Sequence, residues 1–449
     1  MDTPPRLAVD RLLDDPGTRI IVCCGAGGVG KTTTAAALGV RAAERGRKVV
    51  VLTIDPARRL AQSMGIDSLD NTPRLVKGVN GSGGAHGSGE GEGYGEGEGE
   101  GRLHAMMLDM KRTFDEIVEA HADGERARAI LANPFYQSLS AGFAGTQEYM
   151  AMEKLGQLRA RDDWDLIVVD TPPSRSALDF LDAPKRLGSF LDGKFIRVLM
   201  APAKVGGRAG MKFLNVGMSL MTGTLSKLMG ASLLKDVQTF VAAMDTMFGG
   251  FRTRADATFR LLQAPGTAFL VVAAPEPDAL REAAYFVERL AAEKMPLAGL
   301  VLNRVHGSGA DQLSAERALA AAENLEVGGI VDQESGKAGL RESASKPAAA
   351  TDTPEPGSPD GRARARTHDH TDTDIDIDAD VDEITAGLLR LHAERMQVIA
   401  REQRTRDRFA SLHPEVAVVE VAALPGDVHD LAGLRAIGER LAAGVPAGA

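Results

Sequence analysis

The sequence predicts an α/β protein in which a mostly parallel, open sheet is flanked by helices. The prediction rests on short apolar runs, each followed by a polar turn and then by a helical stretch. The clearest runs cover residues 19–24, 48–55, 102–109, 164–170, 267–274, 298–303 and 416–421. Ligands of such sheets bind at the carboxyl ends of the strands. The residues that end these runs are therefore the first candidates for a functional site.

The first apolar run leads into a glycine-rich loop. Residues 25–32 read Gly-Ala-Gly-Gly-Val-Gly-Lys-Thr and match G-x-x-x-x-G-K-[ST], before an alanine-rich helix predicted over 33–44. In this strand–loop–helix setting the backbone N–H groups can wrap a polyphosphate. Lys31 would supply charge to the outer phosphates, and the Thr32 hydroxyl would be a ligand for Mg²⁺. The predicted nucleotide-binding residues of the loop are Gly25, Gly27, Gly28, Val29, Gly30, Lys31, Thr32 and Thr33.

Two strand-terminal carboxylates are expected beside this loop. Asp170 ends the run Leu-Ile-Val-Val-Asp, where a phosphate-loop protein places the acid that orients Mg²⁺; on its own, such an Asp could simply form a turn. Asp55 ends the run that begins at Lys48. It could cap the next helix, or it could position the water that attacks the γ-phosphate.

The composition indicates which binding partners and which cellular compartment to expect. The 449 residues carry a net charge of −10 and 4% aromatic side chains, so we expect no nucleic-acid surface. Cys23 and Cys24 are adjacent on a strand and point to opposite faces, so they form neither an ordinary disulfide nor a metal site. The chain has neither a membrane-spanning apolar run nor the apolar core of a signal peptide. We therefore expect a cytoplasmic protein that meets membranes at most peripherally.

One domain is predicted over 19–449, after an N-terminal tail at 1–17. Glycine- and glutamate-rich residues 78–101 and Pro-, Ser-, Thr- and Asp-rich residues 343–382 are expected to be disordered inserts. Residues 183–262 are expected to form a helical subdomain rich in methionine, including Met218, Met221 and Met229. Flexible methionine side chains suit a groove that binds hydrophobic helices, but they could equally fill a helical core.

Several of these residues carry a family resemblance. The glycine doublet Gly27-Gly28, the Asp-Pro-Ala run from Asp55 and the Asp-Thr-Pro-Pro run from Asp170 resemble the deviant-Walker-A P-loop ATPases. More narrowly, the chain is similar to the arsenical-pump and tail-anchored-protein-targeting ATPase family, as a bacterial member. The match includes Ala-Pro-Glu-Pro at 274–277, Leu-Asn-Arg at 302–304 and the Leu-Pro-Gly-Asp run that begins at Leu424.

The resemblance implies a dimer that opens and closes around ATP and Mg²⁺. It places the catalytic roles on Asp55, as the water-activating switch I residue, and on Lys31. It places Asp170 on the switch II acid near Mg²⁺, together with Thr32 as metal ligand. It also implies nucleotide contacts from Glu276, Asn303 and Pro425 and, in the targeting branch, a helical subdomain whose groove would use Met218, Met221 and Met229.

One departure from the family lies inside the loop itself. The family's signature lysine, which crosses the dimer interface to the partner's phosphates, is Ala26 in this chain. The cysteines of the arsenical-pump metalloid site and of the eukaryotic zinc clip are also missing. We therefore expect a switch ATPase for hydrophobic or membrane-protein clients, working as a heterodimer with a lysine-bearing paralogue or with itself. The alternatives are a regulatory nucleotide-binding subunit with weak ATPase, an anion- or metalloid-transport ATPase, and a Min- or Par-type positioning ATPase.

Overall fold

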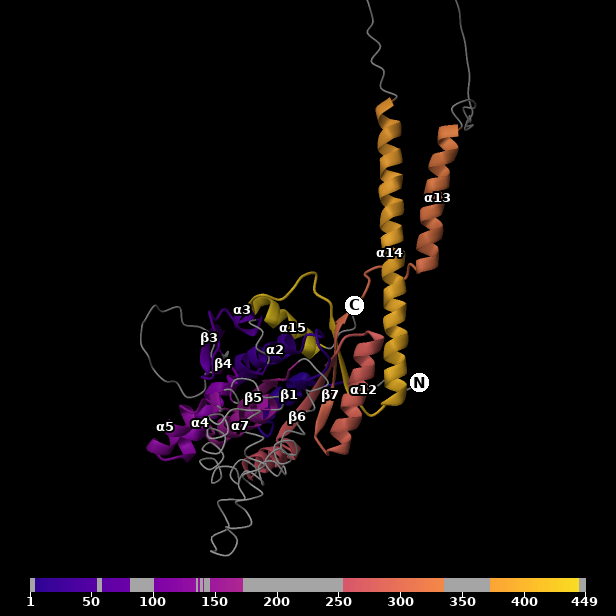
Figure 1. Ribbon diagram of the computed structural model, residues 1–449. Coiled ribbons are helices and arrows are strands. Elements are labelled where there is room, and N and C mark those ends of the chain that lie inside the picture. The colour runs from indigo at the N-terminus through magenta and orange to yellow at the C-terminus, as the bar shows by residue number, and fades with distance from the viewer. Residues whose placement is uncertain are drawn as a thin grey trace, which may run out of the picture. The chain divides into compact units, whose positions relative to one another are not determined.

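The computed structural model describes residues 5–54, 59–80, 101–134, 136–137, 140, 146–172, 253–334 and 372–443. Within these ranges eight strands form one sheet in the order β3-β4-β2-β5-β1-β6-β7-β8 (Figure 1). Every neighbouring pair is parallel except β3 and β4, which are antiparallel. The predicted mostly parallel α/β fold is confirmed. The strands are β1 (Ile20–Cys24), β2 (Lys48–Thr53), β3 (Arg74–Asn80), β4 (Arg102–Met107), β5 (Leu166–Asp170), β6 (Thr267–Ala273), β7 (Leu297–Val305) and β8 (Val418–Ala422).

Helices cover both faces of the sheet. The helices of the described residues, in both compact units, are α1 (Val9–Asp14), α2 (Lys31–Glu44), α3 (Arg59–Ser63), α4 (Met110–His121), α5 (Gly124–Leu131), α7 (Thr146–Ala160), α12 (Pro277–Ala292), α13 (Ala315–Glu334), α14 (Asp372–Leu412) and α15 (Leu431–Ala443). Helices α1, α2 and α15 pack on one face, while α4, α7 and α12 pack on the other (Figure 1). The sheet core is therefore sealed from both sides, as a parallel sheet requires.

Strand β1 shows how the sequence produces this two-sided core. All five of its residues are buried. Ile21 and Cys23 lie in the apolar cluster with α2, whereas Ile20 and Cys24 lie in the cluster with α7 and α12. Successive side chains of a strand point to opposite faces. The two adjacent cysteines are thus separated by the sheet, and both are free thiols.

Two elements were missed by sequence reasoning. Helix α1 lies in the predicted tail, and its Val9 and Leu13 are buried in the cluster with α2. Strand β3 runs into the predicted insert at 78–101 because Val79 is buried. The pairing of β3 with β4 shifts register between Leu75 and Asn80, so its apolar residues do not alternate. A strand with a bulge does not give the period-two signal on which the prediction relied.

The chain divides into two compact units, and the predicted domain bounds of 19–449 stay a prediction. One unit comprises Met1–Val305 and Glu402–Ala447 and holds the sheet, while the other comprises His306–Arg401. Helix α14 begins at Asp372, within the second predicted insert. The described end of the predicted helical subdomain, residues 253–262, is helical.

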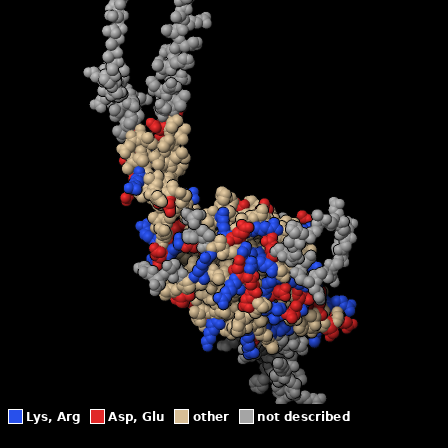
Figure 2. Space-filling model, turned by 180° about the vertical axis from the view of Figure 1, so that it is seen from behind, with Lys and Arg blue, Asp and Glu red and all other residues tan. Residues whose placement is uncertain are grey.

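Surface charge is mixed on the face shown in Figure 2. There Lys and Arg side chains are interspersed with Asp and Glu, and they do not gather into one basic area. None of the described helices has the length and apolar character needed to cross a membrane.

Candidate functional site

The glycine-rich loop connects the carboxyl end of β1 to the N-terminus of α2, as predicted. Gly25, Gly28 and Gly30 have φ values of 147°, 78° and 93°, in the region that favours glycine. Gly30 is the N-cap of α2, so Lys31 and Thr32 form the first turn of the helix. The N–H groups of this turn and the helix dipole face the loop, which is the arrangement that binds phosphate.

Asp170 lies at the centre of the polar contacts around the loop. Its side chain is fully buried, and its Oδ2 accepts hydrogen bonds from Thr32 Oγ1 at 2.7 Å and Thr53 Oγ1 at 2.9 Å. Strand register explains this meeting, because Asp170 on β5 pairs with Thr53 on β2 and with Cys23 on β1. Neighbouring residues of parallel strands point to the same face. Asp170 therefore points to the α2 face, where Thr32 begins the helix.

The Thr32 hydroxyl and the Asp170 carboxylate form an oxygen donor set that fits Mg²⁺. Mg²⁺ takes oxygen ligands, usually one or two from protein together with phosphates and water. Thr32 would hold the ion, and Asp170 would orient it. Bound there, Mg²⁺ would neutralise charge that develops on the phosphates. Thr53 was not predicted as a site residue. It ends β2 and pairs with Asp170 on β5, so the strand register alone could have indicated their contact.

Lys31 is almost completely buried, with 5% of its surface exposed. Its Nζ donates to the carbonyl oxygen of Ala26 at 2.7 Å, so the ammonium group lies against the backbone of the loop. Thr33 is half-buried in the first turn of α2. The loop thus holds a cation within reach of any phosphate that it binds.

A Cβ added at either of two loop glycines would lie too close to a neighbouring atom. A Cβ on Gly25 would lie 2.0 Å from the carbonyl oxygen of Val272 on β6, and a Cβ on Gly30 would lie 2.2 Å from Asn303 Nδ2. Asn303 is buried in β7, and its Nδ2 donates to the Val29 carbonyl oxygen at 2.8 Å. Asn303 therefore holds the loop backbone through this hydrogen bond. A contact of Asn303 with adenine stays a prediction.

Gln147 is a further side chain that the sequence did not single out. It lies in the first turn of α7, and its Nε2 donates to the carbonyl oxygen of Ile54 at 2.9 Å. Ile54 is the residue directly before Asp55, and its own N–H donates to the Asp170 carbonyl oxygen at 3.0 Å. Both backbone polar groups of Ile54, directly before the predicted switch I residue Asp55, are therefore hydrogen-bonded.

The other predicted site residues divide into two groups. Glu276 is the N-cap of α12 after β6, and Pro425 follows β8; both are exposed at the carboxyl-end edge of the sheet. Asp55 and the methionines Met218, Met221 and Met229 lie outside the described residues. Their roles stay predictions.

The two thiols beside the loop, Cys23 and Cys24, are expected to react slowly because both are buried. Burial, reinforced by the negative charge of Asp170, raises the pKa of the Cys23 thiol well above its usual range. Burial also raises the pKa of the Cys24 thiol to about 12. Thiolates are the reactive and metal-binding form of cysteine. Both residues pack in the core, and their raised pKa values disfavour the thiolate form at neutral pH.

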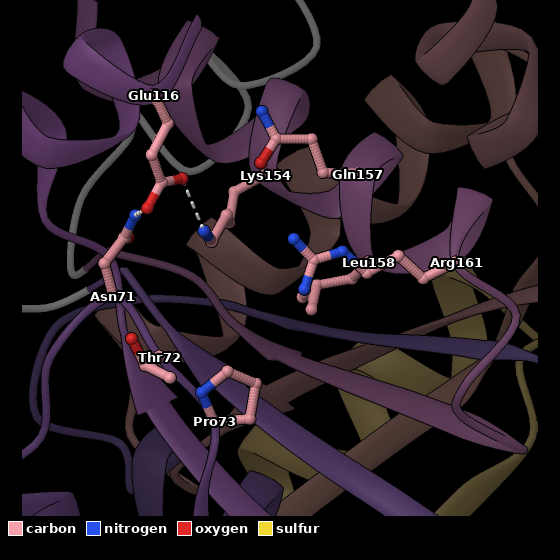
Figure 3. Close-up of a pocket in the computed structure, with 8 residues that line it drawn as sticks. All are labelled: Asn71, Thr72, Pro73, Glu116, Lys154, Gln157, Leu158 and Arg161. Carbon is pink, nitrogen blue, oxygen red and sulfur yellow. Dashed lines mark hydrogen bonds and ion pairs between the residues drawn. The ribbon is translucent and has the colours of Figure 1, made fainter. Parts of the chain in front are cut away.

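A hollow of about 200 Å³ lies away from the loop, lined by the segment directly before β3 and by α4 and α7 (Figure 3). Its polar groups bind one another: Lys154 Nζ lies 2.9 Å from Glu116 Oε2, and Asn71 Nδ2 donates to Glu116 Oε1 at 3.1 Å. This hollow shares no residue with the loop. The residues that line it are Asn71, Thr72, Pro73, Glu116, Lys154, Gln157, Leu158 and Arg161.

Comparison with known proteins settles the family. The sequence profile of the family described as anion-transporting ATPase matches residues 18–83 and 100–325, which include the loop, Asp170 and Asn303. The chain belongs to this family. The gap in the match, 84–99, lies inside the first predicted insert.

Similar proteins of this family are fungal and protist ATPases. An ATPase GET3 of Malassezia globosa is 29% identical over 184 residues, which cover 41% of this chain and 47% of that protein. An ATPase GET3 of Podospora anserina is 24% identical over 313 residues, covering 68% of this chain and 80% of that protein. An ATPase ASNA1 homolog of Cryptosporidium parvum is 26% identical over 285 residues, 63% of each chain. The aligned part thus ranges from about half to four fifths of these relatives.

Proposed function

We propose that this ATPase-family chain binds and hydrolyses Mg·ATP and uses the nucleotide state to control the binding of membrane-associated client proteins. The observation that carries the proposal is the hydrogen bond of 2.7 Å from the Thr32 hydroxyl to the buried Asp170 carboxylate. This contact lies next to a loop whose glycines Gly25, Gly28 and Gly30 have positive φ values. Membership of an ATPase family supports the same reaction.

Each residue near the loop has a separate task in this proposal. The N–H groups of the loop and of the first turn of α2 bind the β- and γ-phosphates, and Lys31 contributes the positive charge. Thr32 would hold Mg²⁺ and Asp170 would orient it, and the ion would supply positive charge to the phosphates. Asp55 positions the attacking water, and Gln147 fixes the preceding peptide through the Ile54 carbonyl group.

Ala26 determines how the site is completed. The loop contains Lys31 but no second lysine at the position from which the family contacts a partner's phosphates. A homodimer would lack that charge at both sites, whereas a paralogue carrying lysine there would complete the site of this chain. We therefore propose a heterodimer. Turnover of the purified chain, alone and mixed with such a paralogue, is the test, and a rate that is high alone and unchanged by mixing contradicts the heterodimer.

The reaction itself is tested by Asp170→Asn, with Asp163→Asn as its matched control because Asp163 is exposed. We expect Asp170→Asn to remove the Mg²⁺ dependence of ATP affinity and to reduce turnover at least about 10²-fold. Asp163→Asn should leave both unchanged. Calorimetric titration with and without Mg²⁺ measures the first quantity, and phosphate release measures the second. Full activity of Asp170→Asn would exclude the proposed metal site.

Client binding is tested separately from hydrolysis. Met218, Met221 and Met229 are replaced together by Asp. If they line a client groove, the variant retains ATP turnover but no longer co-purifies with hydrophobic helices. Unchanged co-purification assigns the methionines to a helical core instead.

One observation favours a second candidate, a regulatory subunit that binds nucleotide but hydrolyses it weakly. Replacement of the signature lysine by Ala26 is what such a subunit would show. Single-turnover hydrolysis with excess protein distinguishes the two. A regulatory subunit releases no phosphate even when a lysine-bearing paralogue is present, while the proposed ATPase does.

A further inference from the structure

Arg304 has a backbone conformation that its place in a strand does not explain. Its φ is 61°, in the left-handed region, which is unfavourable for a residue with a Cβ. Among the described residues, two others besides the glycines have a positive φ, Asp162 and Lys294. These two lie just past the ends of α7 and α12, where a left-handed residue commonly ends a helix. Arg304 instead lies inside β7, so its conformation has a different cause.

Arg304 is the extra residue of a bulge in β7. The pairing of β7 with β8 shifts register between Asn303 and Val305. These two residues pair with consecutive residues of β8, Val421 and Ala422, so Arg304 is left out of the ladder. A bulge re-aims the side chain of the inserted residue, and bulges are frequent next to active sites.

The side chain of Arg304 is exposed next to the phosphate loop. Its neighbours Asn303 and Val305 are buried, whereas Arg304 is exposed. Within the part of the chain that the structure describes, its guanidinium group makes no hydrogen bond or ion pair. Asn303 Nδ2 donates to the Val29 carbonyl oxygen of the loop at 2.8 Å, so Arg304 follows directly on a residue that contacts the loop. An exposed cation therefore lies at the carboxyl end of β7.

The order of the strands indicates which end of a bound nucleotide lies near Arg304. The strands run β2-β5-β1-β6-β7, and the loop follows β1. Thr32 of the loop contacts Asp170 of β5, and these are the two side chains proposed for Mg²⁺. Mg²⁺ accompanies the β- and γ-phosphates, so the outer phosphates belong on the β5 side of the loop. The base, at the other end of the nucleotide, then belongs on the side of β6 and β7.

We propose that Arg304 binds the base of the nucleotide by stacking its guanidinium group on the face of the ring, an inference that rests on the proposed binding of Mg·ATP. A guanidinium group is planar and stacks on aromatic faces. Every base has such a face, so this contact strengthens binding without selecting adenine over guanine. Binding of the base offsets the unfavourable conformation of Arg304, as is common for strained residues at functional sites.

Arg304→Gly tests whether the position is strained. Glycine adopts the left-handed conformation without a steric penalty. Arg304→Gly should therefore unfold at a higher urea concentration than Arg304→Ala, although both lack the guanidinium group. A midpoint no higher than that of Arg304→Ala would show that Arg304 is not strained and would overturn the reasoning from which the proposal starts.

Calorimetric titration of the full chain with ATP, GTP and inorganic tripolyphosphate, each with Mg²⁺, tests the stacking contact. Arg304→Ala should raise the dissociation constants of ATP and GTP by the same factor, at least about fivefold. The constant of tripolyphosphate, which has no base, should stay unchanged. Lys294→Ala is the matched control, because Lys294 is also an exposed cation with a positive φ, 55°, but ends α12. It should leave all three constants unchanged.

Arg304→Lys separates stacking from charge. Lysine keeps the charge but lacks the planar group, so this variant should also bind ATP more weakly than the parent. Full ATP affinity of Arg304→Lys, or weaker binding of tripolyphosphate by Arg304→Ala, shows a contact with phosphate and overturns the stacking. Unchanged binding of ATP and GTP by Arg304→Ala overturns the inference and leaves the proposed function intact. A parent chain that binds neither ATP nor tripolyphosphate contradicts the proposed function itself.

Discussion

Replacement of Gly30 by Ala tests how the loop is supported by β7. Gly30 has φ 93°, and its new Cβ would lie 2.2 Å from Asn303 Nδ2, a separation that side-chain carbons do not adopt. Asn303 must therefore move away and lose its hydrogen bond to the Val29 carbonyl oxygen. Gly46 provides the control, because it has the same φ of 93° and a Cβ added there would meet no atom within 4 Å.

The size of the effect follows from two contributions. A residue other than glycine in a left-handed conformation costs about 1–2 kcal/mol. Loss of a buried hydrogen bond that leaves its acceptor unsatisfied costs about 1–3 kcal/mol. Gly46→Ala should therefore lower the free energy of unfolding by about 1–2 kcal/mol, since only the first contribution applies. Gly30→Ala should lower it by about 2–5 kcal/mol.

Equilibrium unfolding in urea, followed by Trp164 fluorescence, measures these values. Trp164 is the single tryptophan and is buried directly before β5, so its emission reports on the sheet. Adding Asn303→Ala removes the atom that Gly30→Ala would meet. In that background Gly30→Ala should cost only about as much as Gly46→Ala. Strictly additive costs for Gly30→Ala and Asn303→Ala would refute the bracing contact.

Two substitutions and one labelling experiment have defined outcomes. Gln147→Ala should lower kcat for ATP hydrolysis about tenfold with KM nearly unchanged, because it removes the hydrogen bond that fixes the peptide before Asp55. Steady-state ATPase assays measure both constants, and a change in KM alone would contradict this role of Gln147. The hydrogen bond from Arg41 lowers the pKa of the Asp10 carboxyl, so Asp10→Asn should cost about 1 kcal/mol or less above about pH 5 and progressively less as the pH falls through that lowered pKa. Urea unfolding across about pH 3–7 checks this, and a cost that grows toward acid contradicts it. Cys23 and Cys24 should resist alkylation at about pH 8 in the native protein and react in urea; rapid native labelling detected by mass spectrometry would contradict their burial.

The first strand, its loop and the following helix could be predicted because local signals agree there. The apolar run ending at Cys24, the glycines and the alanine-rich helix each favour the same structure. Asp170 could also be predicted, because in a parallel sheet the carboxyl ends of β1 and β5 lie at the same edge. Parallel pairing brings residues that are far apart in the sequence to one place once the strands are recognised.

Contacts that depend on three-dimensional packing could not be predicted. Asn303 contacts Val29, which lies 274 residues earlier in the chain, and nothing local at Leu-Asn-Arg indicates a contact with the loop backbone. Gln147 reaches Ile54 from a helix whose position relative to β2 is set by core packing.

ATP turnover by the chain before and after Ala26→Lys tests the central claim most directly, because that claim assigns the missing charge to a partner chain. Restoring lysine gives a homodimer the charge that crosses the interface, so turnover should rise from slow to at least tenfold faster, with about 10³-fold as the upper range. ATP affinity should stay nearly constant, since the loop and Lys31 are unchanged. Rapid hydrolysis by the unmodified chain, with no increase from Ala26→Lys, would contradict the claim that the site of this chain is completed by another subunit.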